Sequence, residues 1–498
     1  MRRLPIPSGS RVAVVSVRDD ARVLRSPPPG RRPLDVPAAV ADALRFPLSG
    51  SPLEALVTRG GTATIVVEPP ELPVPGALGD PRRLALAATI AELERLGVPS
   101  ERQTILVAGG LNRRAGHREL EALVAPASAR RFHGRVEVHD AEAPDLVDLG
   151  AAGRTPLLAS RCLVETDLVV SVSAAETVLH GGPGTLVGAC GAQTLRAATA
   201  YSLLETAAAR GWQAGLAVER TLATRVPVIG ASLVLNPPRL LGRFRAFPFE
   251  DEGLAQLARS PLRRFSLLPA TVRRRLLQDL PRELTALAAF AGPPSVAHAE
   301  ALLRGIARKS VALERPLDAI VIGMPWKHHH SPRERLNPIT VATVALGLVL
   351  RLWRNVFPVA DGGTAVILHR LSRHFEHGTQ DPYRELFHAL RDGRTGAELA
   401  AAERAAAEDE RALSAYRSGR ACHPLLPYAD WESCRPALDR LGAVVVAGCR
   451  DHQAARTLGF VPTHGIASAL EMAHGRAGGE ARLGWLVGPP YFPLEVGE

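Results

Sequence analysis

Basic and imidazole side chains follow two apolar segments in the second half of the chain. The segment LDAIVIG (317–323) is followed by MPWKHHHSPRER, and the segment TAVIL (364–368) is followed by HRLSRHFEHG. Histidine can carry a proton near neutral pH or bind a metal ion, and lysine can pair with an anion. We therefore predict a catalytic or binding site here. Its candidate residues are Lys327 and His369 for catalysis, His328 and His330 for substrate binding, and His328, His330, His369, His374 and His377 for a metal ion.

A glycine-rich turn follows another apolar segment, LVVSV (168–172), in the first half of the chain. The turn, GGPG at 181–184, precedes an Ala-rich stretch of helical character. Glycines let backbone amides approach an anion, and a helix N-terminus favours negative charge. The turn is neither GxGxxG nor a Walker A motif, so a packing turn remains the alternative. The candidate residues of this half are Gly181, Gly182, Gly184 and Thr185 for a cofactor, His180 for catalysis, and Asn112, Arg113 and Glu176 for substrate.

Short apolar strands separated by helical segments should position these residues. The strand-like segments are 62–67, 104–108, 135–139, 168–172, 231–236, 317–323, 364–368 and 442–447. Helical patterns at 82–96, 339–354 and 397–416 lie between them. This alternation predicts mostly parallel sheets flanked by helices, with ligands beyond the carboxyl ends of the strands.

The predicted fold class is therefore α/β, with two domains that face a shared cleft. The length of 498 residues, with 46% hydrophobic and 22% charged residues, suits two or three globular domains. We expect an N-terminal α/β domain over 1–252, a helical connecting segment over 253–315, and a smaller C-terminal α/β domain over 316–498.

The net charge of +10 would normally suggest an anionic polymer as a partner. However, only two lysines occur, Lys309 and Lys327, and no run of basic residues is interleaved with aromatic residues, which make up 4% of the chain. Stacking platforms for nucleic acid are therefore not expected. The predicted partner is a small anionic molecule, with no nucleic acid.

Cysteine usage and hydropathy point to a cytoplasmic protein. The five cysteines form no CxxC pair, which favours reduced thiols. The N-terminus has no apolar core of a signal peptide, and the longest apolar run, 339–350, is shorter than the ~20 residues that span a bilayer. We expect no membrane association, and the sequence does not predict an oligomeric state.

From about Phe46 to Ala198, the chain resembles the N-terminal domain of the nickel-pincer-nucleotide lactate racemase family. The resemblance rests on TATIVVEPPELPVP, ELERLGVPSE, TILVAGGLNRR, HDAEAPDLVDLG, GRTPLLASRCLVETDLVVSVS and GGPGTLVGACGAQTLRAA, in that order. In the C-terminal half, LDAIVIGMP, GGTAVIL and VPTHGIASALEMA resemble the smaller domain of the family. The resemblance implies an isomerase that acts on a 2-hydroxy acid through a tethered nickel cofactor.

The chain departs from the family at the functional motifs. Asn112 stands where the resemblance implies a proton-accepting histidine, and Gly184 stands where it implies the lysine that tethers the cofactor. A second histidine is missing near Ser173–Ala175, and an Asn-His motif is missing near Ala198–Thr199. The Asp and Arg that follow the first strand in the family are replaced by Pro69 and Leu72. We therefore predict that no covalent nickel-pincer nucleotide forms, and the cofactor is otherwise unknown.

Three functions follow as hypotheses. The first is a divergent racemase or epimerase of a 2-hydroxy acid or related small carboxylate, whose interdomain cleft carries other functional residues than those of the family. The second is a non-catalytic carboxylate- or nucleotide-binding protein on the same fold. The third is a histidine-bound metalloenzyme of other chemistry. Binding without turnover would favour the second, and a metal on two or more of the named histidines would favour the third.

Overall fold

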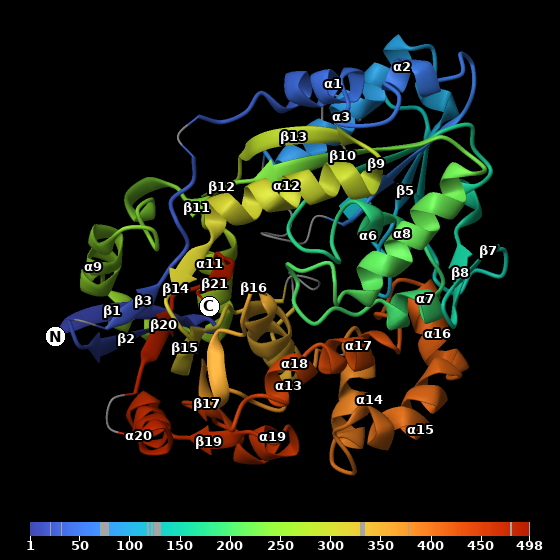
Figure 1. Cartoon of the computed structure of the whole chain (residues 1–498). Coiled ribbons are helices and arrows are strands. Elements are labelled where there is room, and N and C mark those ends of the chain that lie inside the picture. Colours follow the sequence, from blue (N-terminus) through green and yellow to red (C-terminus); the bar gives the residue numbers. More distant parts are fainter. Residues whose placement is uncertain are drawn as a thin grey trace.

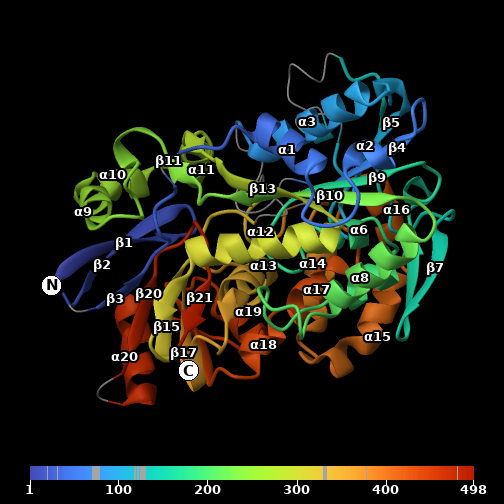
Figure 2. The ribbon, with the colours of Figure 1, turned by 45° about the horizontal axis from the view of Figure 1, so that its top comes forward.

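The computed structural model describes residues 1–19, 21–30, 32–69, 79–116, 119–120, 123, 131–328, 334–376, 378–478 and 481–497. Two α/β domains lie against each other, with the long helix α12 running beside both (Figure 1). Turning the molecule shows the β1–β2 hairpin at one end of the second domain, next to helices α9–α11 (Figure 2). The α/β fold class with two domains is confirmed.

The N-terminal domain is built on a six-stranded sheet in the order β13-β10-β9-β4-β5-β6. Only the edge pair β10/β13 is antiparallel. The strands are β4 (Ala63–Val67), β5 (Gln103–Val107), β6 (Arg135–Val138), β9 (Val169–Ala174), β10 (Val228–Leu235) and β13 (Ala286–Gly292).

Alternate residues of these strands serve two separate cores, as the period of two in a β-strand requires. Ile65 and Val67 pack with helices α1 (Val36–Arg45) and α3 (Pro81–Arg95) on one face. Val66 packs on the other face, toward a second set of helices and a small hairpin. These elements are α6 (Pro183–Val187), α8 (Arg210–Ala223), β7 (Val147–Ala152) and β8 (Thr155–Ala159), and α7 (Ala192–Ala197) lies against α8 and β8. Because both faces are covered, the central strands β4, β9 and β10 are buried along nearly their whole length, whereas the edge strand β6 (RVEV) is not.

The second domain has a six-stranded, fully parallel sheet in the order β19-β18-β17-β15-β20-β3. Its strands are β3 (Arg22–Leu24), β15 (Leu317–Gly323), β17 (Val359–Leu368), β18 (Ala443–Ala447), β19 (Val461–Thr463) and β20 (Leu483–Leu486). Its helices include α14 (Asp381–Ala389), α15 (Gly396–Ala407), α16 (Glu410–Arg417), α17 (Leu426–Glu432), α18 (Arg435–Leu438), α19 (His452–Thr457) and α20 (Ile466–Ala477). Gly323, Leu368 and Ala447 pair in register, which places the ends of three strands at one edge.

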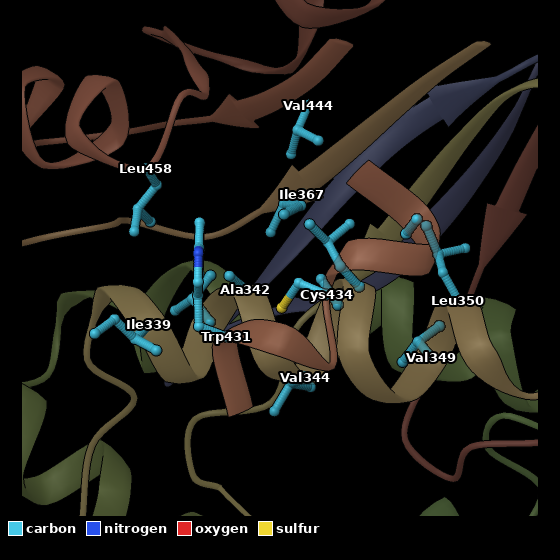
Figure 3. Close-up of a cluster of buried hydrophobic side chains, with 14 of the residues drawn as sticks. Ile339, Ala342, Val344, Val349, Leu350, Ile367, Trp431, Cys434, Val444 and Leu458 are labelled. Atoms are coloured by element: carbon cyan, nitrogen blue, oxygen red, sulfur yellow. The ribbon is translucent and has the colours of Figure 1, made fainter. Parts of the chain in front are cut away.

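The apolar run at 339–350 forms a fully buried helix, as expected. It begins as α13 (Pro338–Ala342) behind a capping box between Asn337 and Thr340, and continues as a π-helical turn over Thr343–Leu348. Figure 3 shows side chains of this helix in one buried cluster with the sheet residue Ile367 and with Trp431. The helix ends at Arg351 rather than at 354, because the next residues form strand β16 (Trp353–Arg354).

The stretch 253–315, for which a helical connection is expected, also contributes to the N-terminal sheet. It contains α9 (Asp251–Arg259), α10 (Leu262–Leu267), α11 (Ala270–Gln278), β12 (Arg282–Glu283), β13, α12 (Pro294–Lys309) and β14 (Val311–Leu313). The sequence of β13, ALAAFAG, has no β-branched residue, but its pairing with β10 makes it a strand. Conversely, β1 (Arg2–Ser8), β2 (Arg11–Val17) and β3 join the second domain.

The remaining elements are short. They are α2 (Leu53–Leu56), β11 (Arg239–Leu240) and β21 (Leu494–Val496). No helix in the described part of the chain is both long and apolar enough to cross a membrane.

Candidate functional site

A cavity of about 590 Å³ lies between the two domains. One wall consists of residues at the ends of strands β4, β5 and β9 of the N-terminal sheet or just past them, such as Glu68, Gly109 and Ala174. The opposite wall comes from the π-helical turn and from α17 and α18 of the second domain, not from the strand ends of that domain. Among the predicted site residues, Asn112, Glu176, His180 and Gly184 line this cavity.

The glycine-rich turn does hold an anion, but the anion belongs to the protein itself. The Gly181 N–H donates to the Glu68 carboxylate at 2.9 Å, and the Thr185 hydroxyl donates to the same oxygen at 3.2 Å. The Gly182 N–H donates to the Ser173 hydroxyl at 2.9 Å. The chemistry expected of these amides is therefore present, and an internal carboxylate occupies the position that we expected for a cofactor.

The position of Gly184 has no room for a side chain. A Cβ atom there would lie 2.4 Å from the Leu179 carbonyl oxygen and 2.9 Å from its carbonyl carbon. These are backbone atoms, so no rotamer change relieves the contact. Neither lysine substitutes for the missing tether, because Lys309 binds Glu176 and Lys327 lies outside the cavity. The residues present do not fit the covalently tethered nickel cofactor that the fold family implies.

The side chains of Glu176 and His180 are held by neighbours within the protein. The Lys309 ammonium group contacts both carboxylate oxygens of Glu176 at 3.0 Å, and both side chains are largely buried. The Nδ1 atom of His180 lies 2.8 Å from the Thr177 hydroxyl, which fixes the plane of its ring. Glu176 is therefore an ion-pair partner at the wall of the cavity rather than a free carboxylate.

Arg351 is a cavity residue that the sequence analysis did not single out as functional. It is 4% exposed, and its guanidinium group donates to the carbonyl oxygens of Gly347, Tyr201 and Ala200. Within the described residues it forms no ion pair with a carboxylate. Burial lowers the pKa of Arg351 to about 10, so the group remains charged at neutral pH. A buried positive charge is costly unless an anion or dipoles compensate it.

The other arginines at the cavity mostly have carboxylate partners. Arg210 is exposed and stands at the first residue of α8. Three paired arginines line the wall, namely Arg82 with Asp80, Arg196 with Glu403, and Arg435 with Asp439. Arg351 thus differs from these three, because only carbonyl groups compensate its charge.

The described basic and histidine residues after β15 and β17 do not line the cavity. The turn between β1 and β2 covers this edge, since the Gly9 N–H donates to the Met324 carbonyl at 3.1 Å. A Cβ atom on Gly9 would lie 3.2 Å from the Nε2 atom of His369. Burial lowers the pKa of His369 to about 4, and burial followed by the charge of Arg282 lowers the pKa of Lys327 to about 8. The three residues predicted for catalysis therefore do not share one site, since His180 lines the cavity and Lys327 and His369 do not.

The other predicted residues are also placed apart. Arg113 pairs with Glu119 at 2.6 Å and does not line the cavity. His328 is buried, and His374 lies 3.7 Å from Glu376. His330 and His377 lie outside the described residues. Among the residues that the structure describes, no group of three or more His, Cys, Asp or Glu side chains is arranged to hold a metal ion.

Comparison with known proteins agrees with this architecture. Residues 10–197 match the model of the lactate racemase N-terminal domain. The structure of the lactate racemase apoprotein from Thermoanaerobacterium thermosaccharolyticum is similar over 99% of this chain and 100% of its own, with a TM-score of 0.61 and 15% identity. A Thermotoga maritima protein solved by a structural genomics consortium gives a TM-score of 0.49 at 13% identity, over 93% of this chain and 97% of its own.

Comparison with curated proteins gives no match. The assignment therefore rests on the family model and on the fold. Residues 10–197 match the lactate racemase N-terminal domain, and the whole chain is similar in fold to the lactate racemase apoprotein.

Proposed function

We propose that this protein binds a small carboxylate in the interdomain cavity and does not use a tethered cofactor. The observation that carries the proposal is Arg351, a buried cation at the cavity whose described partners are all carbonyl groups. A guanidinium group has five N–H donors, and three are used here. A planar carboxylate accepts two parallel hydrogen bonds from such a group, which makes it a suitable ligand.

The position of Gly184, which has no room for a tethering side chain and which we call the closed tether position, supports binding rather than the racemase reaction of the family. Gly184 has no reactive side chain and no space for one, and Glu68 already accepts the nearby Gly181 N–H and the Thr185 hydroxyl. Asn112 stands in place of the proton-accepting histidine that the resemblance implies, and an amide is not a general base at neutral pH. The protein therefore holds its ligand between the domains and leaves the ligand chemically unchanged.

A racemase or epimerase of a 2-hydroxy acid is the second candidate, favoured by the match of residues 10–197 to the lactate racemase domain. His180 lines the cavity and would be the base in that case, with its ring held by Thr177. For this candidate, the unreactive C2 hydrogen of the 2-hydroxy acid must be removed and returned without a tethered cofactor.

Calorimetric titration with D-lactate, L-lactate and malate tests the proposal, with lactamide as a neutral control ligand. We expect at least one carboxylate to bind and lactamide not to bind. Replacing Arg351→Gln should weaken binding by about 10- to 150-fold, because a hydrogen bond to a charged group contributes ~1.5–3 kcal/mol. Arg113→Gln, which removes a cation outside the cavity, should leave the affinity unchanged. Binding of lactamide as tight as that of lactate would contradict the proposal.

Two further readouts separate the candidates. Chiral chromatography of lactate incubated with the protein should show no interconversion, and appearance of the other enantiomer would favour the racemase. After co-expression with the cofactor-making enzymes of the family, the denatured protein should have the mass of the chain alone. A covalent nucleotide adduct would contradict the closed tether position.

A further inference from the structure

Four arginines meet at the carboxyl edge of the second sheet, away from the interdomain cavity. Arg11 begins β2, Arg273 lies in α11, and Arg370 and Arg450 follow β17 and β18 closely. Figures 1 and 2 show the β1–β2 hairpin beside the second domain and next to helices α9–α11. We call these four residues the arginine cluster.

Specific contacts hold the segments of the arginine cluster together. The Nε atom of Arg273 donates to the Ser10 carbonyl at 3.1 Å, and its Nη2 atom lies 3.3 Å from the Ser10 hydroxyl. The backbone N–H of Arg450 donates to the carbonyl oxygen of Leu371, the residue after Arg370, at 3.2 Å. The hairpin turn therefore contacts α11, and the segments after the two strand ends contact each other.

The positive charges of the arginine cluster are not neutralised by the protein. Within the described residues, none of the four guanidinium groups forms an ion pair. Two acidic residues that follow cluster residues in the sequence already have basic partners, since Asp451 lies 3.4 Å from Arg373 and Glu376 lies 3.6 Å from Arg335. The region thus carries an excess of positive charge that the fold itself leaves uncompensated.

The charges also repel one another. Burial lowers the pKa of Arg370, and the other three guanidinium groups of the cluster lower it further. Burial likewise lowers the pKa of Arg273, which is 6% exposed, and neighbouring arginines add to that effect. Like charges held close together without counterions destabilise a protein, and a bound anion would relieve this repulsion.

We propose that the arginine cluster binds a phosphate-bearing small molecule, with a diphosphate group as the recognised element. A monocarboxylate carries one charge in one plane, whereas a phosphate group presents several oxygens and more than one negative charge to guanidinium groups from different directions. The cluster lies beyond the carboxyl ends of parallel strands, where open α/β sheets bind ligands. This site is separate from the proposed carboxylate site.

Accessibility favours a ligand that sits above Arg370 and Arg450. Arg450 is exposed and Arg370 and Arg11 are half-buried, whereas Arg273 is buried beneath them and anchored to backbone carbonyls. Arg273 orients the site, and the outer three guanidinium groups are available for contact. Arg370 and Arg450 are therefore the residues to replace, because their side chains do not hold the core together.

Isothermal titration of the full-length protein with pyrophosphate tests the proposal at an ionic strength of about 0.15 M, where screening over ~8 Å suppresses non-specific attraction. We expect binding of one pyrophosphate per chain. Arg370→Gln and Arg450→Gln should each weaken it about tenfold, since each removes charge-assisted hydrogen bonds. Arg225→Gln, an exposed arginine of the N-terminal domain, is the charge-matched control and should not change the affinity. Arg351→Gln should not change it either.

Thermal unfolding distinguishes loss of the site from loss of the fold. Without pyrophosphate, Arg370→Gln should unfold at the same or a higher temperature than the parent protein, because it relieves repulsion. With pyrophosphate, the parent should gain stability and the variant should gain less. The proposal is overturned if the two cluster variants bind pyrophosphate as tightly as the parent, or if Arg225→Gln weakens binding equally. It is also overturned if single-stranded RNA binds and pyrophosphate does not displace it, since the surface would then be a nucleic-acid interface.

Discussion

Replacing Gly184→Ala tests the closed tether position through stability alone. The added Cβ would lie 2.4 Å from the Leu179 carbonyl oxygen, well inside van der Waals contact. Because the obstructing atoms are backbone, the 179–184 loop must shift, and it is held by the contacts of Gly181 and Gly182 with Glu68 and Ser173. Inserting a group into such a packed site typically costs ~1–3 kcal/mol.

Thermal unfolding followed by circular dichroism measures this cost. A destabilisation of that size lowers the midpoint by roughly 2–12 °C, at ~2–4 °C per kcal/mol for a domain of 150–250 residues. Gly109→Ala is the matched control, because it lies in the same cavity wall and its Cβ would meet only Pro69 at 3.8 Å. An unchanged midpoint for Gly184→Ala would refute the argument that this position excludes a lysine.

Three further predictions concern buried ionisable groups. Burial lowers the pKa of His298 from 6.5 to about 4, so the unfolded chain takes up a proton that the folded protein excludes, and stability should fall as pH decreases from 6.5 to 4. In His298→Gln, the free energy of unfolding measured in urea should depend less on pH between 6.5 and 4. An unchanged dependence on pH would contradict the lowered pKa of His298. Lys309→Met should lower the free energy of unfolding by ~3–5 kcal/mol, because it leaves Glu176 buried without its partner. Urea unfolding of Lys309→Met/Glu176→Leu should show that most of this loss is recovered. A double variant no more stable than Lys309→Met would argue against the ion pair. With a pKa of about 8, Lys327 should be acylated faster than Lys309 at pH 8, as peptide mass spectrometry would show, and the reverse order would contradict its placement.

The sequence predicts the strands of both sheets well wherever β-branched residues form a short apolar run. Segments 62–67, 104–108 and 317–323 became β4, β5 and β15 with bounds that differ by about a residue. Strand β13 was not predicted, because its Ala-rich sequence is a strand only through pairing with β10. Local pattern indicates the central strands, and tertiary pairing decides the edges.

The candidate site was predicted in part, and the errors have one physical cause. The glycine turn at 181–184 was expected to bind an anion, and it does, but its partner Glu68 lies 113 residues away from Gly181. Likewise, the strand edge that carries His369 is covered by Gly9, from the start of the chain. Such long-range contacts leave no trace in local spacing.

Arg351 was missed for a different reason. Its position at the end of a twelve-residue apolar run was interpreted only as the end of that run. A lone charge directly after a segment that must be buried is itself a signal, since the charge is then buried with it or stands at a cavity. In this protein both are true.

A crystal structure of the protein with the carboxylate that binds most tightly tests the central claim directly. The account predicts density in the interdomain cavity, with the ligand carboxylate within hydrogen-bond distance of the Arg351 guanidinium group and Glu68 still bound to Gly181. A ligand carboxylate that instead displaces Glu68 from the Gly181–Thr185 turn, or a cavity without ligand density at saturating concentration, would contradict it.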